Sequence, residues 1–234
     1  MTESKTMIQT YTIVFWEHPH QASLEMTVQQ LERIFESFSD CSEYIDNICV
    51  SYKGKYVDYD SVELNDLVQR GVNHEGKIQF PQLGYRILFR FELFGEKTYG
   101  SALIGASAEN CTNSLNIKIP ENVDLNNPAK SEPVIQLFEK IANTSNWYWG
   151  AVIDTITSRR IGSLFGAGIP TAIHWVNFWG YEIKERIISQ GNSIDEECRM
   201  VNDNIVVLSN TPFDAEDERG IVFRDDLYGK IFWT

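Results

Sequence analysis

A glycine divides the most distinctive segment of the chain, residues 168–188, into two parts of different character. The β-branched and aromatic residues from Ala172 to Phe178 predict a strand that bends at Gly180. Residues Glu182–Ser189 then predict a short amphipathic helix. The alternative is one helix over Thr171–Ser189, because apolar residues also recur there at helical spacing: Ile173, Val176, Trp179 and Ile183.

Helical and extended patterns alternate along the first seventy residues. Residues Tyr11–Trp16 are β-branched and aromatic, which predicts a strand. Thr27, followed three positions later by Gln30, has the spacing of a capping box, and it predicts an amphipathic helix over residues 28–38. We expect residues 44–52 to be extended. A second helix is predicted to end at Gly71, since glycine is favoured just past a helix C-terminus: it covers residues 61–70.

From residue 79 to residue 120 the pattern changes to one of period two. Residues Tyr85–Leu93 alternate in part and place Arg86, Arg90 and Glu92 on one face of a strand. A turn at 95–97 and a returning strand at 101–106 predict a hairpin. A further short strand is predicted at 114–119.

The remaining elements predict a single α+β domain over residues 1–234. Ser131, Glu132 and Pro133 have the composition of a helix start. A buried strand is expected at 147–157, another strand at 204–209 and a closing helix at 221–232. Residues 122–130 form a polar connector, and strands are predicted on both sides of it. We therefore predict one mainly antiparallel sheet with helices packed on one face. Two lobes with a boundary near residues 121–131 are the alternative.

The balance of charge narrows the class of partner. The chain has 20 Lys plus Arg against 33 Asp plus Glu, a formal net charge of −13. Such a chain repels nucleic-acid phosphates and anionic membranes, so we expect neither as a partner, whereas a basic protein is favoured. The first residues lack the apolar core of a signal peptide, and the four cysteines form no CxxC pair. These features predict a cytoplasmic protein with reduced thiols.

Two segments carry most of the negative charge. Residues 17–66 contain 11 acidic residues against three basic ones, and residues 195–226 contain 10 against three. Either segment could steer a basic partner if it lined one face, or could be a solvated loop. For the second segment we predict binding residues at Asp195, Glu196, Glu197, Asp214, Glu216, Asp217 and Glu218.

The residues that could support chemistry lack partners at a known spacing. His174 could act as a general base, but a hydrogen-bonded core histidine is the alternative. His18 and His20 could ligate a metal, although a third ligand is not evident nearby. Asp154 could have a raised pKa or be a paired structural carboxylate. We therefore predict a protein without catalytic residues, metal or cofactor, and not an enzyme.

The order of motifs in the carboxy-terminal half resembles a known family. Pro170, Trp175 and Phe178 form a Pro-x4-Trp-x2-Phe pattern, and a helix, the strand at 204–209, Phe213-Asp214 and the closing helix follow. This order resembles the immunity proteins of bacterial polymorphic toxin systems, especially the immunity protein 52 family.

The resemblance implies an antitoxin that binds a cognate secreted toxin in the same cytoplasm, and the acidic charge fits a basic, nuclease-type effector. Two alternatives stay open. One is a small hydrolase that uses His174. The other is a ligand- or peptide-binding module lined by Trp147, Trp149, Trp175 and Trp179. The sequence leaves the oligomeric state undetermined.

Overall fold

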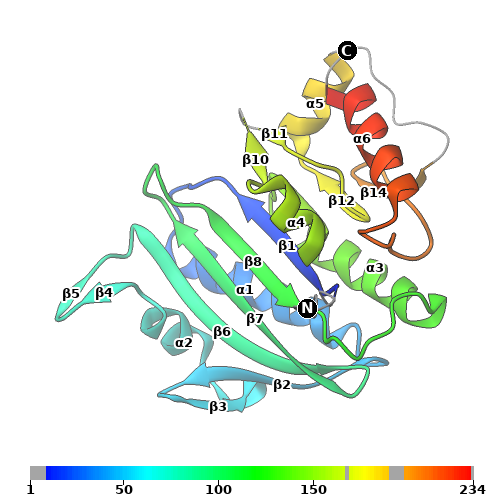
Figure 1. Cartoon of the computed structure of the whole chain (residues 1–234). Helices are drawn as coiled ribbons and strands as arrows, with labels where there is room; N and C mark the ends of the chain where they lie inside the picture. The colour runs from blue at the N-terminus through cyan, green and yellow to red at the C-terminus, as the bar shows by residue number, and fades with distance from the viewer. Residues whose placement is uncertain (1–8, 167–168, 190–197, 233–234) are drawn as a thin grey trace, which may run out of the picture.

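The computed structural model describes residues 9–166, 169–189 and 198–232. Within these residues, ten strands form one antiparallel sheet in the order β13-β14-β12-β9-β1-β8-β7-β6-β2-β3 (Figure 1). The strands are β1 Tyr11–Glu17, β2 Ile45–Tyr52, β3 Lys55–Asp58, β6 Leu83–Leu93, β7 Glu96–Ala106, β8 Asn113–Lys118, β9 Trp149–Asp154, β12 Val176–Trp179, β13 Arg199–Asn202 and β14 Ile205–Val207. The α+β class with a mainly antiparallel sheet is confirmed.

The first strand joins the two halves of the chain at the centre of this sheet. Its Val14 lies opposite Asn116 of β8 on one side and Ala151 of β9 on the other. Two short hairpins lie outside the sheet, β4 His74–Glu75 with β5 Ile78–Gln79, and β10 Phe165–Gly166 with β11 Ile169–Pro170. The helices are α1 Leu24–Ser39, α2 Leu64–Arg70, α3 Pro128–Ala142, α4 Thr155–Ile161, α5 Tyr181–Ser189 and α6 Glu218–Phe232, with a 3-10 turn, η1, at Tyr59–Ser61.

Helices lie on both faces of the sheet, which corrects the expectation of one covered face. On β1, Ile13 and Phe15 belong to a core shared with α1, α2 and α3. Val14 points the other way, into a second core that includes residues of α5 and α6. The second core covers β1 and the carboxy-terminal strands β9, β12 and β14, and none of its residues belongs to β6, β7 or β8. Figure 1 accordingly shows α1 behind β7 and β8, and no helix in front of these two strands.

Several element boundaries differ from the sequence prediction, and at three of them a helix cap lies at another residue than expected. Helix α1 begins at Leu24, where the side chain of Ser23 accepts a hydrogen bond from the Met26 amide, so the capping box at Thr27 was wrong. Helix α3 begins at Pro128, one turn before Ser131. The side chain of Asn127 caps this helix start by accepting a hydrogen bond from the Ala129 amide. The buried strand stops at Asp154, whose carboxylate accepts from the Thr157 amide and starts α4.

The segment around Gly180 forms a strand and then a helix, in the order that the first interpretation predicted, but the strand is shorter, Val176–Trp179, and residues 172–175 lie outside it. Strand β12 pairs with β9 and β14, and α5 begins one residue after the glycine. A Cβ atom at position 180 would lie 2.4 Å from the Trp147 carbonyl oxygen and 2.6 Å from that of Tyr148. The bend therefore requires glycine because the neighbouring backbone leaves no space for a side chain, and the single helix over 171–189 was wrong.

Candidate functional site

The acidic residues predicted to bind a partner divide into two groups. Asp195, Glu196 and Glu197 lie outside the described residues. Asp214, Glu216, Asp217 and Glu218 are all exposed, on the turn before α6 and at its start. The carboxylates of Asp214 and Asp217 accept hydrogen bonds from the Glu216 and Arg219 amides, at 2.9 and 3.2 Å, so they also order this turn.

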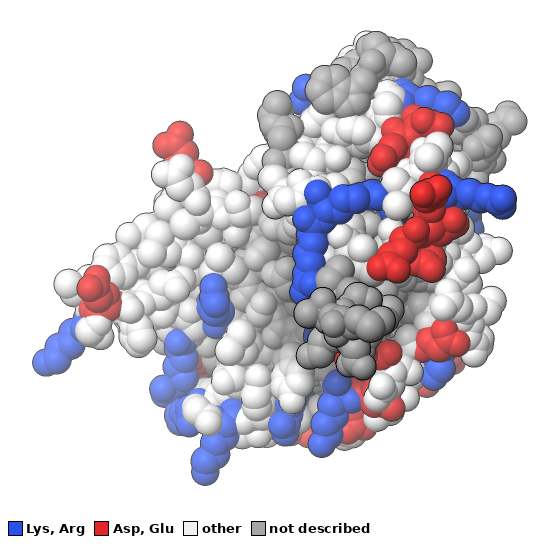
Figure 2. Space-filling view, in the orientation of Figure 1, with Lys and Arg blue, Asp and Glu red and all other residues white. Residues whose placement is uncertain are grey.

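Helix α6 extends this acidic region. Asp225 and Asp226 are exposed, and the Val222 side chain, 57% exposed, lies one turn before Asp226. Figure 2 shows acidic side chains gathered over α6 and the segment before it. We call this set the acidic surface: Asp214, Glu216, Asp217, Glu218, Asp225 and Asp226.

His174 lies in the interior, with 1% of its surface exposed. Its amide donates to the Asn177 side chain at 2.9 Å, and that side chain donates back to the His174 carbonyl at 2.6 Å. Burial lowers the pKa of the imidazole to about 4, although the nearby Asp154 carboxylate opposes this shift. The ring is thus neutral at pH 7 and sealed from solvent, an arrangement typical of a core histidine.

Asp154 and the four tryptophans also take part in packing. Besides capping α4, Asp154 lies 3.5 Å from the Arg224 guanidinium, and both side chains are buried. Arg224 also donates a hydrogen bond to the Thr157 hydroxyl at 2.9 Å, which offsets part of the desolvation of this pair. The tryptophans proposed to line a ligand site are at most 4% exposed: Trp147, Trp149, Trp175 and Trp179.

His18 and His20 follow the end of β1, as the sequence indicated. The His18 ring lies 3.5 Å from the Glu182 carboxylate, and the His20 ring lies 3.9 Å from that of Glu17. Within residues 9–166, 169–189 and 198–232, no three His, Cys, Asp or Glu side chains come together as a metal site would need.

The uncovered half of the sheet presents a basic surface that the sequence only partly indicated. On β6 the side chains of Ile87, Phe89 and Phe91 point into the first core, so Arg86, Leu88 and Arg90 point outward. Across the pairing with β7, Arg90 lies opposite Tyr99, and Leu88 lies opposite Ser101. We call this surface the open face: Arg86, Leu88, Arg90, Glu92, Lys97, Tyr99, Ser101, Asn116 and Lys118.

The charge of this region is opposite to that of the whole chain. Residues 67–120 contain six Lys or Arg and four Asp or Glu. Lys118 and Lys97 have acidic neighbours, in Glu121 at 3.3 Å and in Glu92 across the strand pair. Among the described residues, neither Arg86 nor Arg90 has a carboxylate within 4.0 Å, and Arg90 lies 4.6 Å from the centre of the Tyr56 ring. Figure 2 shows basic side chains spread over this half of the molecule.

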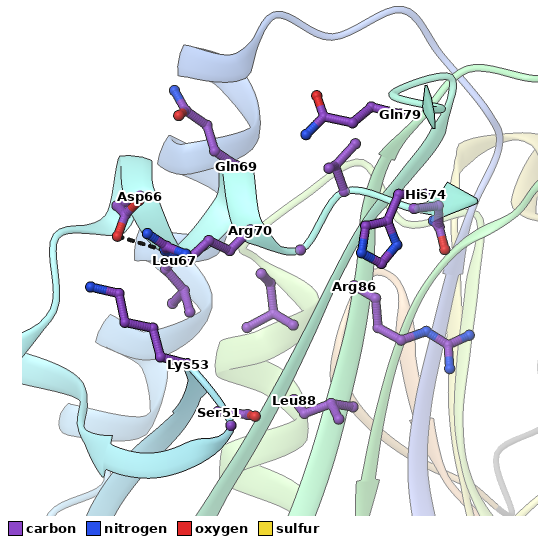
Figure 3. A pocket seen from close by; sticks show the side chains of 15 residues that line it. Ser51, Lys53, Asp66, Leu67, Gln69, Arg70, His74, Gln79, Arg86 and Leu88 are labelled. Carbon is purple, nitrogen blue, oxygen red and sulfur yellow. Dashed lines mark hydrogen bonds and ion pairs between the residues drawn. The ribbon is translucent and has the colours of Figure 1, made fainter. Parts of the chain in front are cut away.

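A basic groove adjoins the open face at the edge of β6. Its volume is about 750 Å³, and its walls are α2, the β2–β3 turn and the strand itself (Figure 3). Lys53, Arg70, His74 and Arg86 line it together with one carboxylate, Asp66. Arg86 and Leu88 belong to both the groove and the open face, so the two surfaces are continuous.

The single carboxylate of the groove is already paired. Asp66 accepts a hydrogen bond from the Arg70 guanidinium at 2.9 Å and another from the Tyr52 hydroxyl. The bond from Arg70, followed by that from Tyr52, holds the pKa of Asp66 below its ordinary value. The Lys53 ammonium lies 4.7 Å from the centre of the Tyr52 ring. The groove therefore keeps an excess of positive charge, at Lys53 and Arg86.

Alternation in residues 85–93 placed Arg86 and Arg90 on one strand face. It did not show that helices leave this face bare, nor that Lys53 and His74 lie beside Arg86. Loop and hairpin residues reach the groove only through tertiary structure, and no local pattern marks them.

Comparisons with known proteins show a shared fold. No family model matches the chain, and no curated protein matches it. Among solved structures, the chain is similar to the Pseudomonas aeruginosa T6SS protein PA0821, with a TM-score of 0.58 and 11% sequence identity, over 96% of this chain and 73% of that one. The resemblance to the immunity protein 52 family stays a prediction. No helix within the described ranges is long and apolar enough to cross a membrane.

Proposed function

We propose that the protein is an immunity protein that binds a cognate bacterial toxin in the cytoplasm and neutralises it. The observation that carries this proposal is the fold, which matches that of a T6SS protein over 96% of the chain. A role beside a secretion system fits the order of motifs from Pro170 to the closing helix. Neutralisation would then need no chemistry, since bound protein blocks access to the active site of the toxin.

The acidic surface is the contact that we assign to a basic region of the toxin. Glu216 and Glu218 are exposed at the start of α6, with Val222 one turn further along the same helix. Carboxylates in this position speed the encounter with a basic protein, and the apolar side chain can be buried in the complex. A nuclease-type effector has the charge that this surface favours.

Co-expression with candidate toxins from genes next to that of this protein tests the proposal. We expect cells to grow when both proteins are present, the toxin alone to stop growth, and the two proteins to purify as a 1:1 complex. If the toxin stays lethal while the protein is folded and abundant, the immunity function is wrong.

Charge reversal tests the acidic surface separately. With Glu216→Lys and Glu218→Lys combined, we expect about a tenfold or greater rise in Kd for the toxin, mainly through slower association at low salt. Glu43→Lys combined with Glu109→Lys is the control with the same change of charge, because both are exposed acids, on the α1–β2 and β7–β8 connections. Equal affinities of the double variant and the control would remove the acidic surface from the interface.

A further inference from the structure

We propose that the basic groove and the open face form one docking site for an acidic region of the partner protein. The inference rests on the proposed function for the identity of the partner, a protein toxin. It adds a second contact, of opposite charge to the acidic surface. The part of the toxin that binds there must carry acidic residues.

The first argument is that several cationic side chains of this surface form no ion pair within the described residues. Lys53, Arg86 and Arg90 lie along β6 and the neighbouring β2–β3 turn, and among the described residues none of them has a carboxylate within 4.0 Å. Guanidinium groups form paired hydrogen bonds with carboxylates, so Arg86 and Arg90 suit the aspartates and glutamates of a partner. The whole chain has a net charge of −13, whereas this cluster is positively charged. It therefore attracts acidic surfaces.

The second argument is the apolar surface among these cations. Leu88 is 41% exposed and Tyr99 is 52% exposed, on adjacent strands of the open face. Ile78, in the β4–β5 hairpin that begins beside the groove, is 64% exposed. Interfaces gain most of their affinity from apolar and aromatic side chains that lose water on binding, surrounded by charged residues that choose the partner.

The third argument concerns the shape. In Figure 3, Lys53 lies on the side of the groove near α2, whereas Arg86 extends on the side towards the open face. Ile87 and Leu88 also line the groove. A chain segment lying in this groove would have cations on both sides, and its continuation would rest on the open face.

A protein partner fits this site better than a nucleic acid does. Nucleic-acid binding draws its affinity from many phosphate contacts, and it weakens with every nearby carboxylate. Here Arg70 and Lys118 are paired with Asp66 and Glu121, and Lys97 lies opposite Glu92. The few cations that remain suit a short acidic segment.

Binding of a labelled glutamate-rich peptide, followed by fluorescence anisotropy, tests the site without the toxin. We expect the wild-type protein to bind, and Arg86→Glu with Arg90→Glu to weaken binding at least tenfold. Leu88→Ala should weaken it less, because it removes only apolar contact. Arg33→Glu is the control for one such charge reversal, since Arg33 is exposed on α1, behind the sheet.

Several outcomes would overturn the inference. These are no binding by the wild-type protein, equal loss in the Arg33 control, or tighter binding of an oligonucleotide of matched charge. A dimer in light scattering that the Arg86 and Arg90 variant disrupts would instead assign the site to a second copy of this chain. Circular dichroism of each variant excludes loss of folding as the cause.

The same variants separate this inference from the immunity function. If the Arg86 and Arg90 variant protects cells from the toxin as well as the wild type, the docking site is wrong and the immunity function stands. If the wild type fails to protect cells but binds the peptide through these arginines, the immunity function is wrong and the site stands.

Discussion

The two halves of the sheet are covered differently. Strands β6, β7 and β8 bury one face against α1 and α2, and their outward positions hold Arg86, Arg90 and Asn116. Strands β9, β12 and β14 are buried on both faces, and every residue of β9, from Trp149 to Asp154, is buried. One sheet thus shows the alternating pattern of a half-exposed strand and the continuous apolar pattern of a fully covered one.

The comparison assigns stability mainly to one half of the sheet and binding to the other. The doubly covered half makes large apolar contacts on both sides, so its residues are constrained by packing. Strands β6, β7 and β8 are stabilised by one core only, so their other face can contact a partner. Changes in the first half should therefore alter folding, and outward changes in the second should alter binding.

The largest expected effect comes from Trp149→Ala. The Trp149 side chain is fully buried in the second core and stacks on Trp16, with ring centres 4.6 Å apart. Truncation would leave a large cavity, so we expect the free energy of unfolding to fall by about 3–5 kcal/mol. Urea denaturation measures it, and a loss below about 1 kcal/mol would contradict tight packing on this face.

A smaller effect is expected from pH, through His174. The unfolded histidine takes up a proton near pH 6.5, whereas burial holds the folded pKa at about 4. Between these values the unfolded state binds more protons, so stability falls as the pH decreases. From pH 7 to pH 5 this histidine should cost about 2 kcal/mol.

His174→Gln isolates that contribution, because other carboxylates titrate in both proteins. We expect the variant to lose about 2 kcal/mol less than the wild type over the same pH interval. Denaturant unfolding at the two pH values measures the difference. Parallel pH profiles would show that the buried ring does not remain neutral in the folded protein.

The smallest effect on stability is expected from Leu88→Ala on the open face. Because the side chain is 41% exposed and no helix covers it, the free energy of unfolding should change by less than about 0.5 kcal/mol. Thermal unfolding of Leu88→Ala and Trp149→Ala, each compared with the wild type, measures the difference between the two losses of stability. A loss similar to that of the tryptophan would mean that the open face is part of a core.

The sequence predicted most elements because local patterns determine them. The periodicity of residues 28–38 and the alternation of residues 85–93 both appear where expected, as α1 and β6. Helix starts were less accurate, since Ser23 and Asn127 compete as caps with Thr27 and Ser131, and packing selects among them. An interior position was one of the two alternatives for His174, and the buried strand expected at 147–157 contains Trp149.

The open face and the basic groove could not be predicted in the same way. Whether a strand face is bare depends on where distant helices pack, and α5 and α6 stop at the carboxy-terminal half. The groove combines Lys53, Arg70 and Arg86 from three elements, and the Asp66 carboxylate is ion-paired there with Arg70. These are products of topology, which residue spacing alone does not show.

The central position of β1 has a consequence for synthesis. Its Val14 pairs with Asn116 and Ala151, so the strand emerges from the ribosome long before either neighbour exists. During that interval both edges of an apolar strand are without their native partners, a state open to wrong pairing with other chains. Folding of the complete sheet must then wait for β14, the last of its strands in the chain, and contacts of high sequence separation form slowly. The nascent chain is therefore most vulnerable while its first strand is unpaired.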